Sequence, residues 1–224
     1  MKTLILVDLQ NDFMPGGALA VPGGHEVLPI ANAIQRCFDI VIATADWHPP
    51  GHGSFASAHP GAQVGQLVEL AGRPQMLWPD HCVQNTSGAE FSPGLDAARI
   101  ARIIYKGMDP NIDSYSGFFD NGRQRSTALE GYLRSRGVDA IYVMGLATDY
   151  CVKFTALDGV ALGFTTYLIE DGCRGVEVVP GDVVRAVSEM RAAGVRIISS
   201  RQLDVSGGAR GGVPEGVPGG APQE

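Results

Sequence analysis

VDAIYVMGLATDYC, residues 138–151, joins an apolar run to a turn and the start of a helix. The run 138–143 predicts a buried strand, and the residues after Thr148 include good helix formers. Thr148 is a suitable N-cap, which would make Asp149 the first helical residue and Cys151 the third. A thiol in the first turn of a helix faces free backbone N–H groups and the positive end of the dipole, which lower its pKa. The same N–H groups could hold an oxyanion, so the stretch predicts a nucleophile beside an oxyanion site.

This prediction for Cys151 competes with a simpler one. Free cysteine is among the most buried residue types, and most single cysteines are inert parts of a core. A strand-to-helix turn favours reactivity without establishing it. Catalysis therefore requires partner residues elsewhere in the chain.

Further apolar runs indicate the fold around this stretch. Helical segments lie between several of the runs, which is the pattern of βαβ units and of a parallel sheet covered on both faces. We expect a three-layer α/β/α, doubly wound domain with a mostly parallel sheet over residues 1–204. Residues 205–224 are rich in Gly and Pro and are expected to be a disordered tail. The expected strands are 3–7, 39–43, 100–105, 138–143, 165–169 and 195–198, and the expected helices are 26–36, 127–136, 149–162 and 182–193.

Composition excludes several classes of function. The 224 residues carry a net charge of −7, which does not favour nucleic acid or an anionic membrane surface. No run approaches the roughly 18 apolar residues of a membrane span, and polar residues from Asp8 onward interrupt any leader. The cysteines are widely spaced without a CxxC pair, which favours reduced thiols in the cytoplasm. The cysteines are Cys37, Cys82, Cys151 and Cys173.

Two charged residues follow other predicted strands. Asp8 comes after the first strand and Lys106 after the third. Because ligands of such sheets bind beyond the carboxyl ends of the strands, both should converge on Cys151. A carboxylate can accept the thiol proton, and an ammonium can stabilise the thiolate. Taken singly, Asp8 could be a turn cap and Lys106 a solvated surface residue; their shared location favours catalysis.

A second constellation lies in the irregular stretch 47–92. Asp46 and His48 alternate on an extended segment and therefore point the same way, and His81 comes about thirty residues later. One carboxylate and two imidazoles suit a first-row divalent ion such as Zn²⁺, Fe²⁺ or Mn²⁺, with positions left for water or substrate. The alternative is that these histidines cap loops or face water. Whether the nearby His52 also contacts an ion stays open.

At several points the chain resembles the nicotinamidase (pyrazinamidase) branch of the isochorismatase-like cysteine hydrolase superfamily. The resemblance spans residues 1 to about 200. The Asp, Lys and Cys motifs recur across the superfamily, whereas the two metal-type motifs are more specific to this branch. The matching segments are DLQNDF (8–13), DWHP (46–49), HGSF (52–55), WPDHC (78–82), KG (106–107) and GLATDYCV (145–152).

The resemblance implies an amidohydrolase of the NAD salvage route. It would convert nicotinamide to nicotinate and ammonia, and pyrazinamide to pyrazinoate, through a thioester. Asp8 would be the general base, Lys106 its electrostatic partner and Cys151 the nucleophile.

The resemblance also implies the rest of the site. Asp46, His48 and His81 would hold one divalent ion, zinc first among the candidates. The Leu146–Ala147 bond would be cis, and the N–H groups of Ala147 and Cys151 would form the oxyanion hole. The wall of the pyridine pocket would comprise Phe13, Leu19, Trp78 and Tyr115, for which core packing is the simpler alternative.

Other functions remain open on the sequence alone. An amidase acting on ureidoacrylate or N-carbamoylsarcosine would share the Asp, Lys and Cys motifs. A silent metal-binding module on the same fold is a further alternative. The partner expected here is a small-molecule substrate, with neither nucleic acid nor membrane, and a homo-oligomer is possible.

Overall fold

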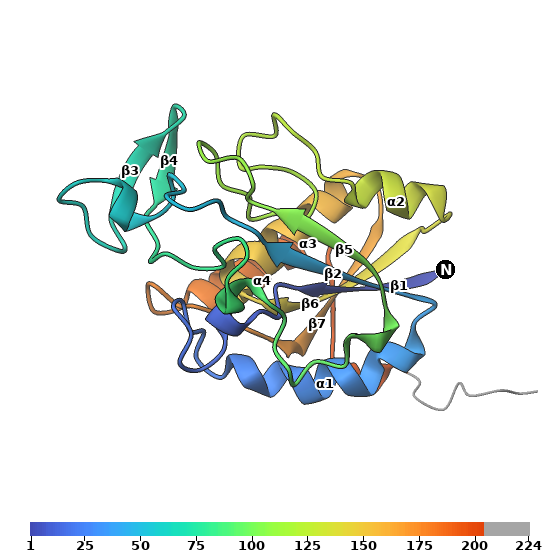
Figure 1. The fold of residues 1–224 in the computed structure, drawn as a ribbon. Coiled ribbons are helices and arrows are strands. Elements are labelled where there is room, and N and C mark those ends of the chain that lie inside the picture. The colour runs from blue at the N-terminus through green and yellow to red at the C-terminus, as the bar shows by residue number, and fades with distance from the viewer. Residues whose placement is uncertain (204–224) are drawn as a thin grey trace, which may run out of the picture.

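A six-stranded parallel sheet forms the centre of the computed structural model, which describes residues 1–203 (Figure 1). All neighbouring strands run parallel, in the order β5-β2-β1-β6-β7-β8. The predicted parallel sheet is therefore confirmed, and the predicted tail, 205–224, lies outside the described residues. The strands are β1 (Lys2–Val7), β2 (Ile40–Asp46), β5 (Ile100–Lys106), β6 (Ala140–Leu146), β7 (Thr165–Arg174) and β8 (Arg196–Ile198).

Four helices cover the sheet, as predicted. In Figure 1, α1 lies on one face, whereas α2 and α3 lie on the other, which gives the expected three layers. Helix α4 packs against α3. The helices are α1 (Val27–Ile34), α2 (Leu129–Ser135), α3 (Lys153–Ala161) and α4 (Asp182–Ala192).

The centre of the sheet is apolar because both of its faces are covered. Strands β1 and β6 are almost entirely buried and pair in register, with Val7 opposite Gly145. At Gly145 the backbone φ is +125°, and a Cβ atom there would lie 2.2 Å from the carbonyl oxygen of Val7. Only glycine allows this approach, which fixes the residues after β1 beside those after β6.

The order of the strands defines where a ligand site should form. From β1 the chain proceeds outward through β2 to β5, and from β6 it proceeds the other way through β7 to β8. The direction therefore reverses between β1 and β6, and doubly wound sheets bind ligands outside the carboxyl ends of the strands at such a reversal.

The stretch 47–92 is less irregular than expected. It contains a separate two-stranded antiparallel hairpin of β3 (Leu67–Leu70) and β4 (Arg73–Met76), which projects from the body of the molecule (Figure 1). Most side chains of the hairpin are exposed or half-buried, so its sequence has no apolar alternation to reveal it. Among the helices within residues 1–203, none has the length and apolarity needed to cross a membrane.

Candidate active site

The three predicted catalytic side chains meet at the carboxyl ends of the strands. Asp8 follows β1, Lys106 ends β5, and Cys151 lies in the turn after β6. Nζ of Lys106 lies 2.9 Å from Oδ2 of Asp8 and donates to Sγ of Cys151 at 3.3 Å. All three residues are buried. The structure thus brings an ammonium into contact with both a carboxylate and a thiol.

Lys106 also joins this triad to the predicted metal ligands. Its Nζ donates to Oδ1 of Asp46 at 2.6 Å and to the carbonyl oxygen of Ser114 at 3.0 Å. Burial opposes the charged form of Lys106, but Asp46 and Asp8 outweigh it and raise the pKa of the ammonium well above its ordinary value. Lys106 is therefore a permanent positive charge between two carboxylates.

The acidity of the thiol differs from the sequence-based prediction. Burial raises the pKa of Cys151 well above its ordinary value, and Lys106 offsets this only in part. The expected lowering by the helix dipole is wrong because the thiol is withdrawn from water more deeply than the turn alone implies. The thiol is therefore protonated at rest, and a base must accept its proton.

Asp8 is placed to act as that base. One of its carboxylate oxygens lies within 4.8 Å of the Cys151 sulfur. The hydroxyl of Thr44 donates to Oδ1 of Asp8 at 2.6 Å, which leaves Oδ2 facing Lys106. Burial raises the pKa of Asp8 above its ordinary value, against the opposing effect of Lys106. A carboxylate of raised pKa is a better proton acceptor than an exposed aspartate.

The turn that carries Cys151 is wider than predicted. Ala147, rather than Thr148, is the extended residue that precedes it, and the peptide bond Leu146–Ala147 is cis, as the family resemblance implies. The N–H of Val152 donates to the carbonyl of Ala147 five residues back, so residues 148–152 form a π-helical turn. Helix α3 begins only afterwards, and Cys151 lies fourth in the turn instead of third in an α-helix.

The predicted metal ligands form a second buried cluster. Nε2 of His48 lies 3.8 Å from Oδ2 of Asp46, and Nε2 of His81 lies 3.9 Å from the same oxygen. The Nδ1 atoms are hydrogen-bonded to the carbonyl oxygens of Gly107 and Pro79, at 2.9 and 2.8 Å respectively. Each ring therefore turns Nε2 toward Asp46.

This cluster fits a divalent ion. Nε2 of His48 is buried and has no hydrogen-bond partner, as expected for a nitrogen that coordinates a metal. Burial lowers the pKa of His48 to about 4, so its ring is neutral and its lone pair is available. Burial opposes the charged form of Asp46, but the charge of Lys106 and its hydrogen bond act against it, and the pKa of Asp46 lies below its ordinary value, which keeps that carboxylate ionised. Two neutral imidazoles and one carboxylate match the ligands of a first-row ion.

His52 lies against this cluster without joining its three ligand atoms. Its ring centroid is 4.5 Å from that of His48. Both of its nitrogens are occupied, because Nδ1 is hydrogen-bonded to Ser54 Oγ at 2.8 Å and Nε2 to the carbonyl of Asp109 at 2.7 Å. These bonds hold the His52 ring in place beside His48.

The predicted substrate residues line one small inner pocket between the two clusters. Its cavity volume is about 30 Å³, so only a small group fits without side-chain movement. Three further residues contribute to its wall: Asp113, Tyr150 and Val176. Only Tyr150 had a sequence signal, its position beside Cys151. The predicted residues that line the pocket are Phe13, Leu19, Asp46, Trp78, His81, Tyr115, Ala147 and Cys151.

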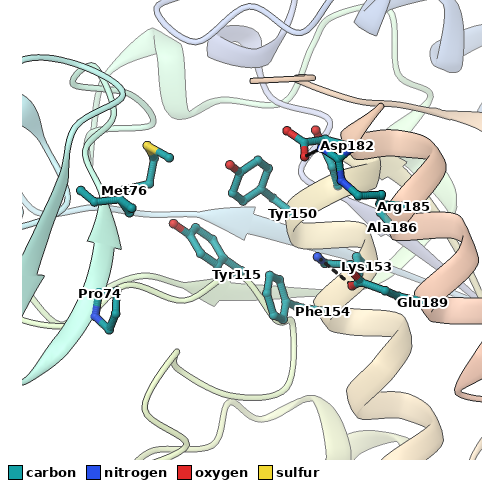
Figure 2. Close-up of a pocket in the computed structure, with 12 residues that line it drawn as sticks. Pro74, Met76, Tyr115, Tyr150, Lys153, Phe154, Asp182, Arg185, Ala186 and Glu189 are labelled. Carbon is teal, nitrogen blue, oxygen red and sulfur yellow. Dashed lines mark hydrogen bonds and ion pairs between the residues drawn. The ribbon is translucent and has the colours of Figure 1, made fainter. Parts of the chain in front are cut away.

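A larger groove lies outside this pocket. Figure 2 shows the groove between the β3–β4 hairpin on one side and helices α3 and α4 on the other, with a cavity volume of about 280 Å³. Tyr115 and Tyr150 line both spaces, and their ring centroids are 5.4 Å apart. The two tyrosines therefore separate the outer groove from the thiol.

Such a site on this sheet defines a class of protein, the α/β/α cysteine hydrolases. The isochorismatase domain model matches residues 2–202 of the chain. A nicotinamidase of Escherichia coli is 52% identical over 200 residues, with 88% of this chain and 93% of the relative covered. The chain belongs to the isochorismatase family.

Solved structures agree with this assignment. The nicotinamidase of Acinetobacter baumanii is 46% identical and superposes with a TM-score of 0.88, covering 90% of this chain and 97% of its own. The pyrazinamidase of Pyrococcus horikoshii in complex with zinc is 41% identical, with a TM-score of 0.72 and coverage of 88% and 98%.

Proposed function

We propose that the protein is an amidohydrolase that converts nicotinamide to nicotinate and ammonia, and that it also accepts pyrazinamide. The observation that carries the proposal is the position of Lys106, whose ammonium contacts Asp8, Cys151 and Asp46 at once. The thiol and the carboxylate that we assign as nucleophile and base therefore lie beside the metal-type cluster, around a small pocket lined by aromatic side chains. The nicotinamidase relatives supply the substrate class.

Asp46, His48 and His81 would hold one divalent ion. When bound, the ion supplies a Lewis-acidic position for the pyridine nitrogen of the substrate. The zinc complex of the Pyrococcus relative makes zinc the first candidate. Phe13, Trp78 and their neighbours in the inner pocket would enclose the ring and exclude water.

The first half of the reaction forms a thioester. Asp8 takes the proton of the Cys151 thiol, and the thiolate attacks the carboxamide carbon. The N–H groups of Ala147 and Cys151 would stabilise the tetrahedral oxyanion, an effect worth about 3–4 kcal/mol per donor in other enzymes. Asp8 then returns the proton to the amide nitrogen, the C–N bond breaks and ammonia leaves. Lys106 stays charged throughout and balances the negative charge as it moves from Asp8 to the sulfur.

The second half regenerates the enzyme. Asp8, now ionised, accepts a proton from a water molecule that attacks the thioester carbon. The carbon–sulfur bond breaks, the proton on Asp8 returns to the sulfur of Cys151, and nicotinate departs. The nucleophile must stay reduced, and the described cysteines are all free, so we place the enzyme in the cytoplasm.

Replacing the nucleophile tests this mechanism. Cys151→Ala should abolish ammonia release while nicotinamide still binds, measured by calorimetry, because the pocket wall and the metal ligands remain. Turnover within tenfold of the wild type would rule out covalent catalysis by Cys151.

A substrate comparison separates the proposed activity from the alternatives. Wild-type protein should release ammonia from nicotinamide and pyrazinamide far faster than from ureidoacrylate or N-carbamoylsarcosine. The reverse preference would assign the protein to another amidase of the family, and no release from any of them would favour a silent binding module.

A further inference from the structure

Asp113 is a buried carboxylate that the mechanism above does not use. It lies in the segment after β5, is 3% exposed, and lines the inner pocket together with Asp46 and His81. Its Oδ1 lies 4.0 Å from Nε2 of His48, the buried nitrogen without a hydrogen-bond partner. Two buried polar atoms that face one another across such a gap need a cation or a hydrogen-bond donor between them.

The carboxylate of Asp113 is held firmly in this position. The N–H of Ser114 donates to Oδ1 at 2.7 Å, and Nε2 of Gln75 donates to Oδ2 at 3.2 Å. Each carboxylate oxygen has two lone pairs, so Oδ1 can accept one more hydrogen bond. The backbone contact and the glutamine therefore orient an acceptor toward the metal-type cluster.

The distances place Asp113 next to an ion rather than on it. Ligand atoms lie about 2.0–2.2 Å from zinc, so two ligands of one ion are separated by at most about 4.4 Å. Oδ1 of Asp113 lies within this limit of His48 Nε2, at 4.0 Å. However, among the described residues Asp113 does not join Asp46 and His81 in a group of atoms within 4.8 Å of one another, whereas His48 does. A water molecule on the ion would bridge the remaining distance to Oδ1.

The charges of the buried residues agree with this placement. Four aspartates are buried among the described residues, and one of them, Asp149, accepts two backbone N–H groups. The other three, Asp8, Asp46 and Asp113, lie at the thiol and the metal-type cluster. Lys106 is the buried base that contacts two of these three. With the acids ionised, one divalent ion makes this set neutral. The net charge of the site is the same whether the proton shared by Asp8 and Cys151 lies on the carboxylate oxygen or on the sulfur. Without Asp113 the occupied site would carry an uncompensated positive charge, which is costly in a buried position.

We propose that Asp113 is a positioning residue for the metal, whose Oδ1 accepts a hydrogen bond from a metal-bound water and whose charge stabilises the ion. The inference rests on the metal site of the proposed function. It deepens that proposal by adding a carboxylate beyond the three ligands.

Metal affinity tests the role directly. Zinc is removed from wild-type protein and from Asp113→Asn, and the dissociation constant of Zn²⁺ is measured by competition with a chromophoric chelator. Loss of a residue that hydrogen-bonds to the groups on a metal typically weakens metal binding 10–100-fold. We expect the affinity of Asp113→Asn for Zn²⁺ to fall within this range. Asp113→Glu restores the charge and should recover most of the affinity.

Asp149→Asn is the matched control. Asp149 is also a buried carboxylate near Cys151, but it accepts the N–H groups of Val176 and Glu177, at 3.0 and 2.8 Å. Its variant should bind Zn²⁺ within twofold of the wild type. Equal affinity in Asp113→Asn and the wild type would overturn the role of Asp113. Failure of the wild type itself to bind Zn²⁺ would instead overturn the metal site.

A crystal structure of the zinc-loaded wild type tests the geometry without any substitution. We expect a zinc-bound water within hydrogen-bond distance of Oδ1 of Asp113. Zinc on Asp46, His48 and His81 with no such water, or with Asp113 turned away, would overturn the proposal even if Asp113→Asn failed to fold.

Discussion

At the scale of single residues, Lys106 joins the catalytic pair, Asp8 and Cys151, to the metal-type cluster by direct contact. Its ammonium contacts one oxygen each of Asp8 and Asp46, so the second oxygen of Asp46 remains for the histidines. Substitution by a neutral residue would leave two buried carboxylates uncompensated, which is more damaging than loss of a surface ion pair. Lys106 therefore serves the fold and the chemistry together.

Thr44 gives a residue-scale prediction about the general base. Its hydroxyl stabilises the ionised form of Asp8 through a 2.6 Å hydrogen bond, and Thr44→Val removes that donor with little change of shape. The pKa of Asp8, already raised by burial, should rise further. Activity that needs ionised Asp8 is lost as pH falls through this pKa, so the acid limb of kcat/KM should move to higher pH. An unchanged pH profile in the folded, metal-loaded variant would contradict the role of Thr44 in stabilising ionised Asp8.

At the scale of elements, the approach of β1 to β6 positions the base beside the nucleophile. Gly145→Ala would place a Cβ 2.2 Å from the carbonyl oxygen of Val7, in a backbone conformation that side chains rarely adopt. Strain and overpacking of this kind each cost about 1–3 kcal/mol, so we expect destabilisation of about 2–6 kcal/mol in urea unfolding. Gly131→Ala in α2 meets no atom within 4 Å and should stabilise by about 0.5–1 kcal/mol. Equal effects of the two substitutions would contradict the argument.

The sequence predicts most of these elements and the residues at their ends. The positions of Asp8 and Lys106 are predictable because each follows an apolar run, and those of Asp46 and His48 because alternate residues of an extended segment share a side. The predicted direction of the Cys151 pKa shift is wrong, because the shift depends on how deeply the folded chain buries the thiol. Thr44 looks like any strand residue until Asp8 lies beside it.

Loops contribute the pocket residues that sequence could not reveal. Val176 reaches the inner pocket from the segment after β7, and its N–H donates to Asp149, a residue distant in the chain. Asp113 likewise has no strand end or motif to mark it. Such positions follow from tertiary contacts, which a local pattern does not encode.

At the scale of the whole molecule, ion binding should be coupled to stability. Asp46 and His48 lie two residues apart, whereas His81 belongs to a distant segment that only the folded chain brings beside them. An ion that binds only the folded state at a concentration 100 times its dissociation constant stabilises by about 2.7 kcal/mol. It also relieves the repulsion among buried carboxylates that would otherwise oppose folding.

Metal removal therefore predicts a measurable loss of thermal stability. For a domain of this size about 1 kcal/mol shifts Tm by about 2–4 °C, so the metal-free protein should melt about 5–10 °C below the zinc-saturated protein in calorimetry. His81→Ala removes one ligand and should largely abolish the difference, since its metal-free form gains little from added zinc. A Tm that zinc and chelator leave unchanged in the wild type would contradict a folded-state metal site and, with it, the charge balance argued for Asp113.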